Sequence, residues 1–190
     1  MKNKIIVGFL SIILLFALTG CGINKTSTET QINQISKENK KTNCTVLECI
    51  KKLKTENTVE EINKVVGFEG KLTDETYNKY TWTFSDDEAL TATYYSPDKA
   101  TIEATYDRDS LKNKKVDFSK YDEIQSALKS SSSLTYDEFK EKLGNVDGHL
   151  ISISSSSNKY IWVNKNGEYL TGTFSNTTNK CTFVIGRIVK

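Results

Sequence analysis

The sequence predicts an α+β protein made of two tandem repeats, each a helix–loop–helix unit followed by an antiparallel sheet. First, a segment recurs about 80 residues downstream: Asn78–Trp82 reads Asn-Lys-Tyr-Thr-Trp and Asn158–Trp162 reads Asn-Lys-Tyr-Ile-Trp. Second, matching helix-start signals precede both segments, and strands with a period of two follow them. Third, the order of helices and then hairpin-linked strands is typical of the α+β class. A duplicated unit of this length indicates a repeat architecture.

The N-terminus, residues 1–20, is expected to be a signal peptide. Lys2 and Lys4 give it a positive start, and an apolar stretch follows that is too short to span a bilayer comfortably. The stretch ends in Leu-Thr-Gly-Cys at 18–21, which resembles the lipobox of bacterial lipoproteins. The resemblance implies cleavage before Cys21, acylation of its thiol, and anchoring on the extracytoplasmic face of the cell membrane. The alternative is a simple secretory signal followed by an unrelated cysteine.

Residues 21–43 are expected to form a disordered tether. They are polar, lack aromatic residues, and cannot bury enough apolar surface to fold. A short helix around Ile32 and Ile35 is the competing interpretation.

The first repeat is expected over residues 44–117 and begins with two short amphipathic helices. Thr45 and Glu48 have the spacing of a capping box, and Thr58 caps the next helix. Gly67 stands where a left-handed residue ends a helix. The apolar positions at helical spacing are Val46, Leu47, Ile50 and Leu53, and then Val59, Ile62 and Val66.

The second repeat is expected over residues 118–190 and follows the same order. Ser119 is the expected cap of its first helix and Thr135 of its second, with Gly144 ending the latter. The buried positions of these helices are expected to be Tyr121, Ile124 and Leu128, and then Tyr136, Phe139 and Leu143.

Three strands are expected in each repeat because apolar and polar residues alternate. They are 80–84, 90–94 and 102–106, and then 160–163, 170–174 and 181–185. Further strands are expected near Lys71–Leu72 and Leu150–Ser154. Asn166-Gly167 predicts a two-residue type I′ turn.

The alternation also assigns the strand residues to two faces. Trp82 and Trp162 are expected to face the helices as core anchors. The outward residues are expected to be more apolar in the second repeat than in the first, and an exposed apolar patch is a candidate binding surface. The candidate partner-binding residues are Tyr95, Ile161, Val163, Thr171, Thr173 and Val184. The alternative is that part of this face packs on the other repeat.

With Cys21 acylated, three cysteines remain. Cys44 and Cys49 occupy the two positions of a hydrophobic staple, so their side chains meet as a disulfide or as a plain apolar contact. Cys181 is expected to be a buried thiol on a strand whose inward residues also include Phe183 and Ile185.

Charge and motifs exclude several classes of function. Removing the signal peptide leaves 24 basic and 24 acidic residues, so no nucleic-acid partner is expected. The sequence has a single histidine, His149, which is expected to be solvated. We find no Gly-x-Ser-x-Gly elbow, Cys–His pair, metal-ligand spacing or phosphate loop, and expect no catalytic residue, metal or cofactor.

The repeat resembles that of the beta-lactamase inhibitor protein family and its lipoprotein relatives. The resemblance rests on the helix ends at 58–67 and 135–144, the Tyr-x-Trp strands, and the Leu-Thr-x-Thr strands at 90–93 and 170–173. It covers residues 44–190. A more distant resemblance is to the small lipoprotein of the outer-membrane β-barrel assembly machinery.

The resemblance implies one concave sheet surface that grips a protein, with a hairpin tip of the first repeat entering the target. The matching tip here contains Asp86 and Asp87. This chain departs from the family in having no cystine within each sheet unit, and threonines where the inhibitors carry aromatic residues.

We therefore expect a surface-anchored lipoprotein that acts as a non-enzymatic protein-binding module, with inhibition of the bound protein as one form of that role. The partner would be an extracellular or envelope protein. The alternatives are an envelope-assembly or structural lipoprotein, and an immunity protein against a secreted enzyme or toxin.

Overall fold

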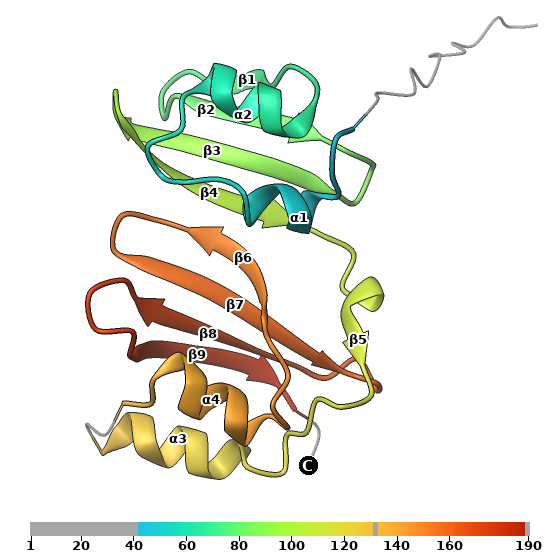
Figure 1. Ribbon diagram of the computed structural model, residues 1–190, viewed down its shortest axis with the longest axis vertical. Helices are drawn as coiled ribbons and strands as arrows, with labels where there is room; N and C mark the ends of the chain where they lie inside the picture. Colours follow the sequence, from blue (N-terminus) through green and yellow to red (C-terminus); the bar gives the residue numbers. More distant parts are fainter. Residues whose placement is uncertain (1–41, 131–132, 189–190) are drawn as a thin grey trace, which may run out of the picture. The chain divides into compact units, whose positions relative to one another are not determined.

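The computed structural model describes residues 42–130 and 133–188, which form four α-helices and nine strands (Figure 1). The helices are α1 (Val46–Ile50), α2 (Val59–Val66), α3 (Tyr121–Lys129) and α4 (Tyr136–Lys142). The strands are β1 (Lys71–Asp74), β2 (Lys79–Thr83), β3 (Ala89–Ser96), β4 (Lys99–Thr105), β5 (Lys112–Asn113), β6 (His149–Ile153), β7 (Ser157–Asn164), β8 (Tyr169–Ser175) and β9 (Cys181–Arg187). All the predicted strands are present, and β5 was not predicted.

The predicted N-caps Thr45, Thr58 and Thr135 begin three of these helices, and all three form capping boxes. Thr45, Thr58 and Thr135 each accept a hydrogen bond from the N–H three residues on, and the glutamate at that position accepts the threonine's own N–H. These bonds satisfy donors that a first helical turn leaves without intrahelical partners. Gly67 has a φ of 97° and Gly144 a φ of 85°, so both adopt the predicted left-handed conformation.

Helix α3 begins differently from the prediction. The hydroxyl and N–H of Ser119 both donate to the carboxylate of Asp117, and no side chain caps the helix at Lys120. Glu123 instead accepts hydrogen bonds from Lys120 (2.7 Å) and from Lys142 of α4 (2.9 Å). These two ammonium groups lower the pKa of Glu123 to about 2. The predicted Ser119 cap is therefore wrong, because the Asp117 carboxylate takes its hydroxyl.

The strands join into one sheet in the order β1-β2-β3-β4-β6-β7-β8-β9, and every pair along this path is antiparallel. The short β5 lies off the path and pairs with β7 in parallel. The first and second halves of the sheet meet where Ile102 and Glu103 of β4 pair with Ile153 and Ser152 of β6. The fold is therefore α+β with a single open sheet.

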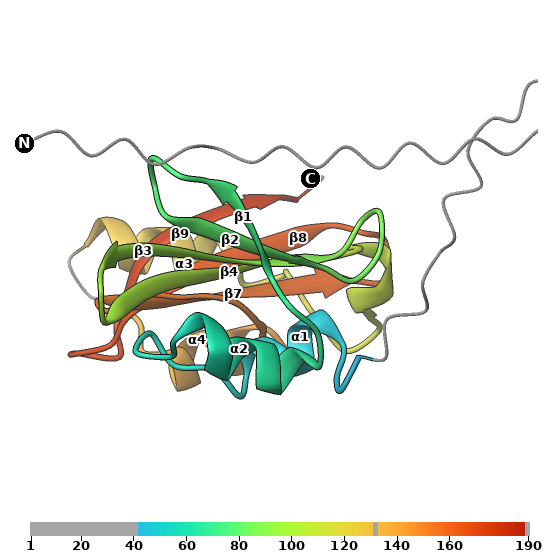
Figure 2. The ribbon, with the colours of Figure 1, turned by 90° about the horizontal axis from the view of Figure 1, so that it is seen from above.

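Helices of both halves cover the same face of this sheet. Figure 2 shows α1, α2 and α4 on one side of the strands. Trp82 is fully buried in the cluster under α1 and α2, and Trp162 is 1% exposed in the cluster under α3 and α4. Their indole N–H groups donate to the Asn63 side chain (2.7 Å) and to the Val146 carbonyl (2.8 Å). The prediction that both tryptophans are core anchors is confirmed.

The hairpin between β7 and β8 differs from the predicted two-residue turn. Its strands end at Asn164 and resume at Tyr169, and Asn164 N–H donates to the Glu168 carbonyl across the loop. A type I′ turn needs two consecutive residues with positive φ. Gly167 has a φ of 81°, whereas Asn166 is absent from the positive-φ residues of the described chain. The loop is longer because the Asn164 side chain accepts the N–H groups of Asn166 and Glu168.

The predicted signal peptide, Cys21 and residues 22–41 of the predicted tether, including Ile32 and Ile35, lie outside the described residues. Within residues 42–130 and 133–188, no helix has the length and apolar character needed to cross a membrane.

Candidate binding surface

The face opposite Trp82 and Trp162, here called the open face, is where the sequence analysis places the predicted binding residues. In its second half the prediction is wrong for three of them. Ile161 is 2% exposed, Val163 1% and Thr171 8%, so they are buried rather than available to a partner. The alternative, that part of this face packs on the other repeat, is the correct one, because Leu47, Tyr106 and Leu111 of residues 44–117 contact it.

The cover comes from the segment that connects the two halves and from α1. Leu111, Ile151, Ile161 and Val163 form a buried cluster, here called the seam cluster, against which Leu47, Tyr106 and Tyr169 pack. The parallel pairing of Lys112 in β5 with Val163 holds the connecting segment against β7. The strand β7 therefore has a buried side chain layer on each of its faces, with Trp162 on one and Val163 on the other.

Polar contacts close the rim of the seam cluster. The guanidinium carbon of Arg108 lies 4.3 Å from the centre of the Tyr169 ring, within cation–π range. Lys112 Nζ lies 3.0 Å from the Asp109 carboxylate. These contacts fix the connecting segment without adding buried charge.

The predicted face of β9 is inverted. Val184 points toward the helices, where it packs on the cluster of Trp162, while Phe183 and Ile185 are 58% and 56% exposed. The cause is a bulge: Thr173 pairs with Phe183 but Phe174 pairs with Cys181, so Thr182 is an extra residue. Cys181 keeps the predicted inward position at 1% exposure, and the residues after Thr182 change sides.

Phe183 and Ile185 are thus binding candidates that the sequence analysis missed. Phe183, Val184 and Ile185 are three consecutive apolar residues, so alternation alone fits either phase of the strand. Nothing in the sequence marks the bulge, and only the pairing with β8 decides the phase.

Tyr95 is exposed on the open face, as predicted. It is the extra residue of a bulge between Tyr94 and Ser96 in β3, and it is 75% exposed. Thr173 is half-buried beside Phe183. One row of side chains crosses the open face from β2 to β9 through directly paired residues. In strand order the row is Thr81, Thr91, Glu103, Ser152, Lys159, Thr173 and Phe183.

Asp86 and Asp87 are exposed at the tip between β2 and β3, where Phe84 N–H donates to the Glu88 carbonyl. Strand β3 begins just after this tip and ends near Tyr95. At about 3.3 Å per residue, Asp87 and Tyr95 are about 26 Å apart. The structure therefore does not bring the acidic tip and Tyr95 into one small site.

Several titratable groups of the described chain have pKa values that are shifted by contacts within the fold. The pKa values of Glu48, Glu61 and Glu138 are lowered because each carboxylate accepts the backbone N–H of its capping threonine. His149 is half-buried rather than solvated as predicted; burial, with Lys51 nearby, lowers its pKa. Burial raises the pKa of the Cys181 thiol to about 11. In residues 42–130 and 133–188, no three His, Cys, Asp or Glu side chains are grouped to hold a metal.

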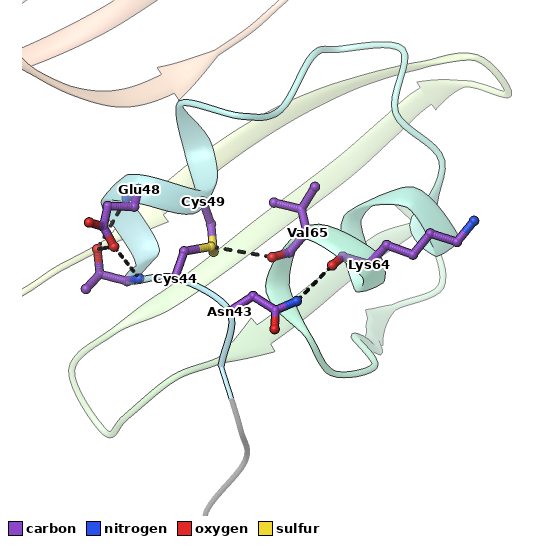
Figure 3. The surroundings of a disulfide bond; sticks show 7 residues. Asn43, Cys44, Glu48, Cys49, Lys64 and Val65 are labelled. Atoms are coloured by element: carbon purple, nitrogen blue, oxygen red, sulfur yellow. Dashed lines mark hydrogen bonds between the residues drawn. A yellow bond between two sulfur atoms is a disulfide. The ribbon is translucent and has the colours of Figure 1, made fainter.

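The cysteine pair that the sequence left open is a disulfide. Cys44 and Cys49 are bridged, with their Cα atoms 5.6 Å apart (Figure 3). Beside it, the N–H and side-chain amide of Asn43 donate to the carbonyls of Val66 (2.9 Å) and Lys64 (3.0 Å). The Cys44 sulfur lies 3.5 Å from the Val65 carbonyl, a polar contact, since a bridged sulfur has no proton to donate. The start of the fold is thus fixed to the end of α2.

A comparison of the chain with protein families, with curated proteins and with solved structures finds no match.

Proposed function

We propose that this chain is a non-enzymatic protein-binding module, anchored to the extracytoplasmic face of the cell membrane by a lipid on Cys21. Its partner is an extracellular or envelope protein that docks on the open face. The observation that carries this proposal is the arrangement of the layers: the helices of both halves cover one face of a single sheet, which leaves large side chains exposed on the other.

The exposed groups of the open face suit a protein partner. Tyr95 at one end and Phe183 and Ile185 at the other are more than half exposed. Aromatic side chains of this kind are enriched at the centres of protein interfaces and depleted elsewhere on surfaces. Between them lie Glu103, which is negative, and Lys159, which is positive, in a row that otherwise consists of threonine and serine residues. A partner would therefore combine apolar contacts at two places with hydrogen bonds between them.

The proposal includes two tandem repeats, related to the beta-lactamase inhibitor protein family, whose joined sheets form a concave face. Two features support the duplication. The capping boxes of α2 and α4 recur. In each half a glycine just before the first strand lies on the tryptophan: a Cβ at Gly70 would collide with the ring of Trp82, and one at Gly148 would be 2.6 Å from the ring of Trp162. Only glycine fits at these contacts without displacing a ring.

The test is capture of a partner by the full-length chain in native membranes, with two matched tyrosine variants. Tyr95→Ser should lower cross-linked capture about fivefold or more, the loss expected for an exposed aromatic residue that a partner buries. Tyr77→Ser is the control, because Tyr77 is 63% exposed but lies in the turn between β1 and β2. Equal capture by both variants and the unmodified chain would refute the open face as the binding surface.

A further inference from the structure

The sheet ends in two edges that no other described strand covers along their length. Strand β1 pairs only with β2, and β9 pairs along its length only with β8. At the start of β9, the Cys181 N–H donates to the Leu134 carbonyl and Lys180 bridges to Thr135. The edge that stays free in β9 therefore runs from Thr182 to Arg187. Free strand edges are templates for pairing with another chain.

Most of the large apolar side chains that are exposed in the described chain lie on these two edge strands. Of the five large apolar side chains that are exposed in the described chain, Leu72 lies on β1, and Phe183 and Ile185 lie on β9. The other two, Tyr77 and Tyr95, lie in a turn and a bulge. Exposed apolar side chains on an open edge favour contact with another chain, and the charged residues beside them decide which edges can pair.

The strand directions allow a second copy of this chain to continue the sheet. Eight strands follow one another along the path, and each pair is antiparallel, so β1 and β9 run in opposite directions. A copy placed beside the first in the same orientation would bring its β1 antiparallel to β9. The helices of both copies would then lie on the same face, and the ladder would continue without interruption.

Charge favours the pairing of β1 with β9 over the pairing of either edge with the same edge of a second copy. The β9 edge carries Lys180 and Arg187 and has no acidic residue from 180 to 188. The β1 edge carries Glu69, Asp74 and Glu75 against Lys71. Pairing β9 with β9, or β1 with β1, would bring like charges together, which disfavours association. Pairing β1 with β9 brings opposite charges together.

One register satisfies both the faces and the charges. With Leu72 opposite Val184, both residues lie on the helix-covered face, while Thr73 meets Phe183 and Lys71 meets Ile185 on the open face. Glu69 then lies opposite Arg187, and Asp74 meets Thr182, where the free edge begins. Residues 69–72 thus match residues 184–187 in a regular ladder, and the bulge of β1 at Thr73 lies opposite Phe183.

We propose that copies of this chain associate edge to edge, with β1 of one copy pairing antiparallel to β9 of the next. The contact uses different surfaces on the two copies, so it can extend into a chain of molecules. The paired stretch is short and falls below the roughly 1,200 Å² of a stable interface. The association is therefore weak and increases with protein concentration.

The test is disulfide trapping between two populations of the full-length chain in detergent, one with Thr73→Cys and one with Phe183→Cys. Directly opposed residues on paired strands are close enough for a disulfide. Mixing the populations should give heterodimers at high concentration, whereas each population alone should give no more dimer than the unmodified chain. A second pair, Lys71→Cys with Ile185→Cys, should behave in the same way.

Charge reversal tests the register. Arg187→Glu in the Phe183→Cys chain should lower the heterodimer yield about threefold at low salt, and Glu69→Arg in the other chain should restore it. Lys52→Glu, at the end of α1, is the control and should leave the yield unchanged. The proposal is overturned if both cysteine pairs give no heterodimer, if one population alone cross-links as well as the mixture, or if charge reversal has no effect.

Discussion

Val163 offers the sharpest test of the seam cluster, because sequence alternation alone places it in water and the structure buries it. The substitution Val163→Ala removes two methyl groups from a side chain that is 1% exposed. At about 0.8 kcal/mol for each buried carbon, plus a smaller term for the cavity left behind, the cost is about 2 kcal/mol. For a fold of this size, that corresponds to a fall in Tm of about 4–8 °C.

Thr83→Ala is the matched control, since Thr83 stands 80 residues before Val163 on the corresponding strand and is exposed. It should change the free energy of unfolding by less than about 0.5 kcal/mol. Chemical denaturation of both variants, followed by tryptophan fluorescence, gives the two values. If Val163→Ala costs no more than Thr83→Ala, the connecting segment does not cover this face and the seam cluster is wrong.

Cys21→Ala should abolish incorporation of labelled fatty acid and release the chain from membranes; continued labelling would refute the anchor. Replacing Cys44 and Cys49 together by alanine should lower the free energy of unfolding by about 2 kcal/mol, because the disulfide closes only a short loop. Chemical denaturation without reducing agent measures this difference. Stability should also fall between pH 10 and 12. Burial raises the pKa values of Tyr94 and Tyr136 to about 12, so stability is complete below pH 10 and is lost as pH rises through 12. A Tm that stays constant over this range would contradict their burial.

Local signals made most of the fold predictable. A helix start such as Thr58 depends on residues within one turn, and the buried side of a strand such as 80–84 depends on alternation along the strand itself. Both kinds of signal act over a few residues, so the sequence carries them directly. The three capping boxes, the left-handed glycines and both tryptophan anchors follow from such signals.

The candidate site was less predictable because it depends on contacts between distant segments. Ile161 and Val163 follow the alternation of an exposed face, and the packing of residues 106–113 and of Leu47 against β7 buries them. Val184 faces the helices and Ile185 faces the open side, the reverse of the prediction, because β9 contains one extra residue, Thr182. An insertion of one residue reverses every later side chain of a strand, and the sequence contains no local mark of it.

The most direct test of the account compares two isoleucines on the open face of the second half. Ile161→Asp and Ile185→Asp introduce the same charge, but Ile161 is 2% exposed and Ile185 is 56% exposed. Tm and partner capture are measured for each in the full-length chain. We expect Ile161→Asp to unfold the protein, because a buried carboxylate has no partner there. Ile185→Asp should keep its Tm within a few degrees and lose capture. Unfolding by Ile185→Asp together with a stable Ile161→Asp, or full capture by Ile185→Asp, would contradict it.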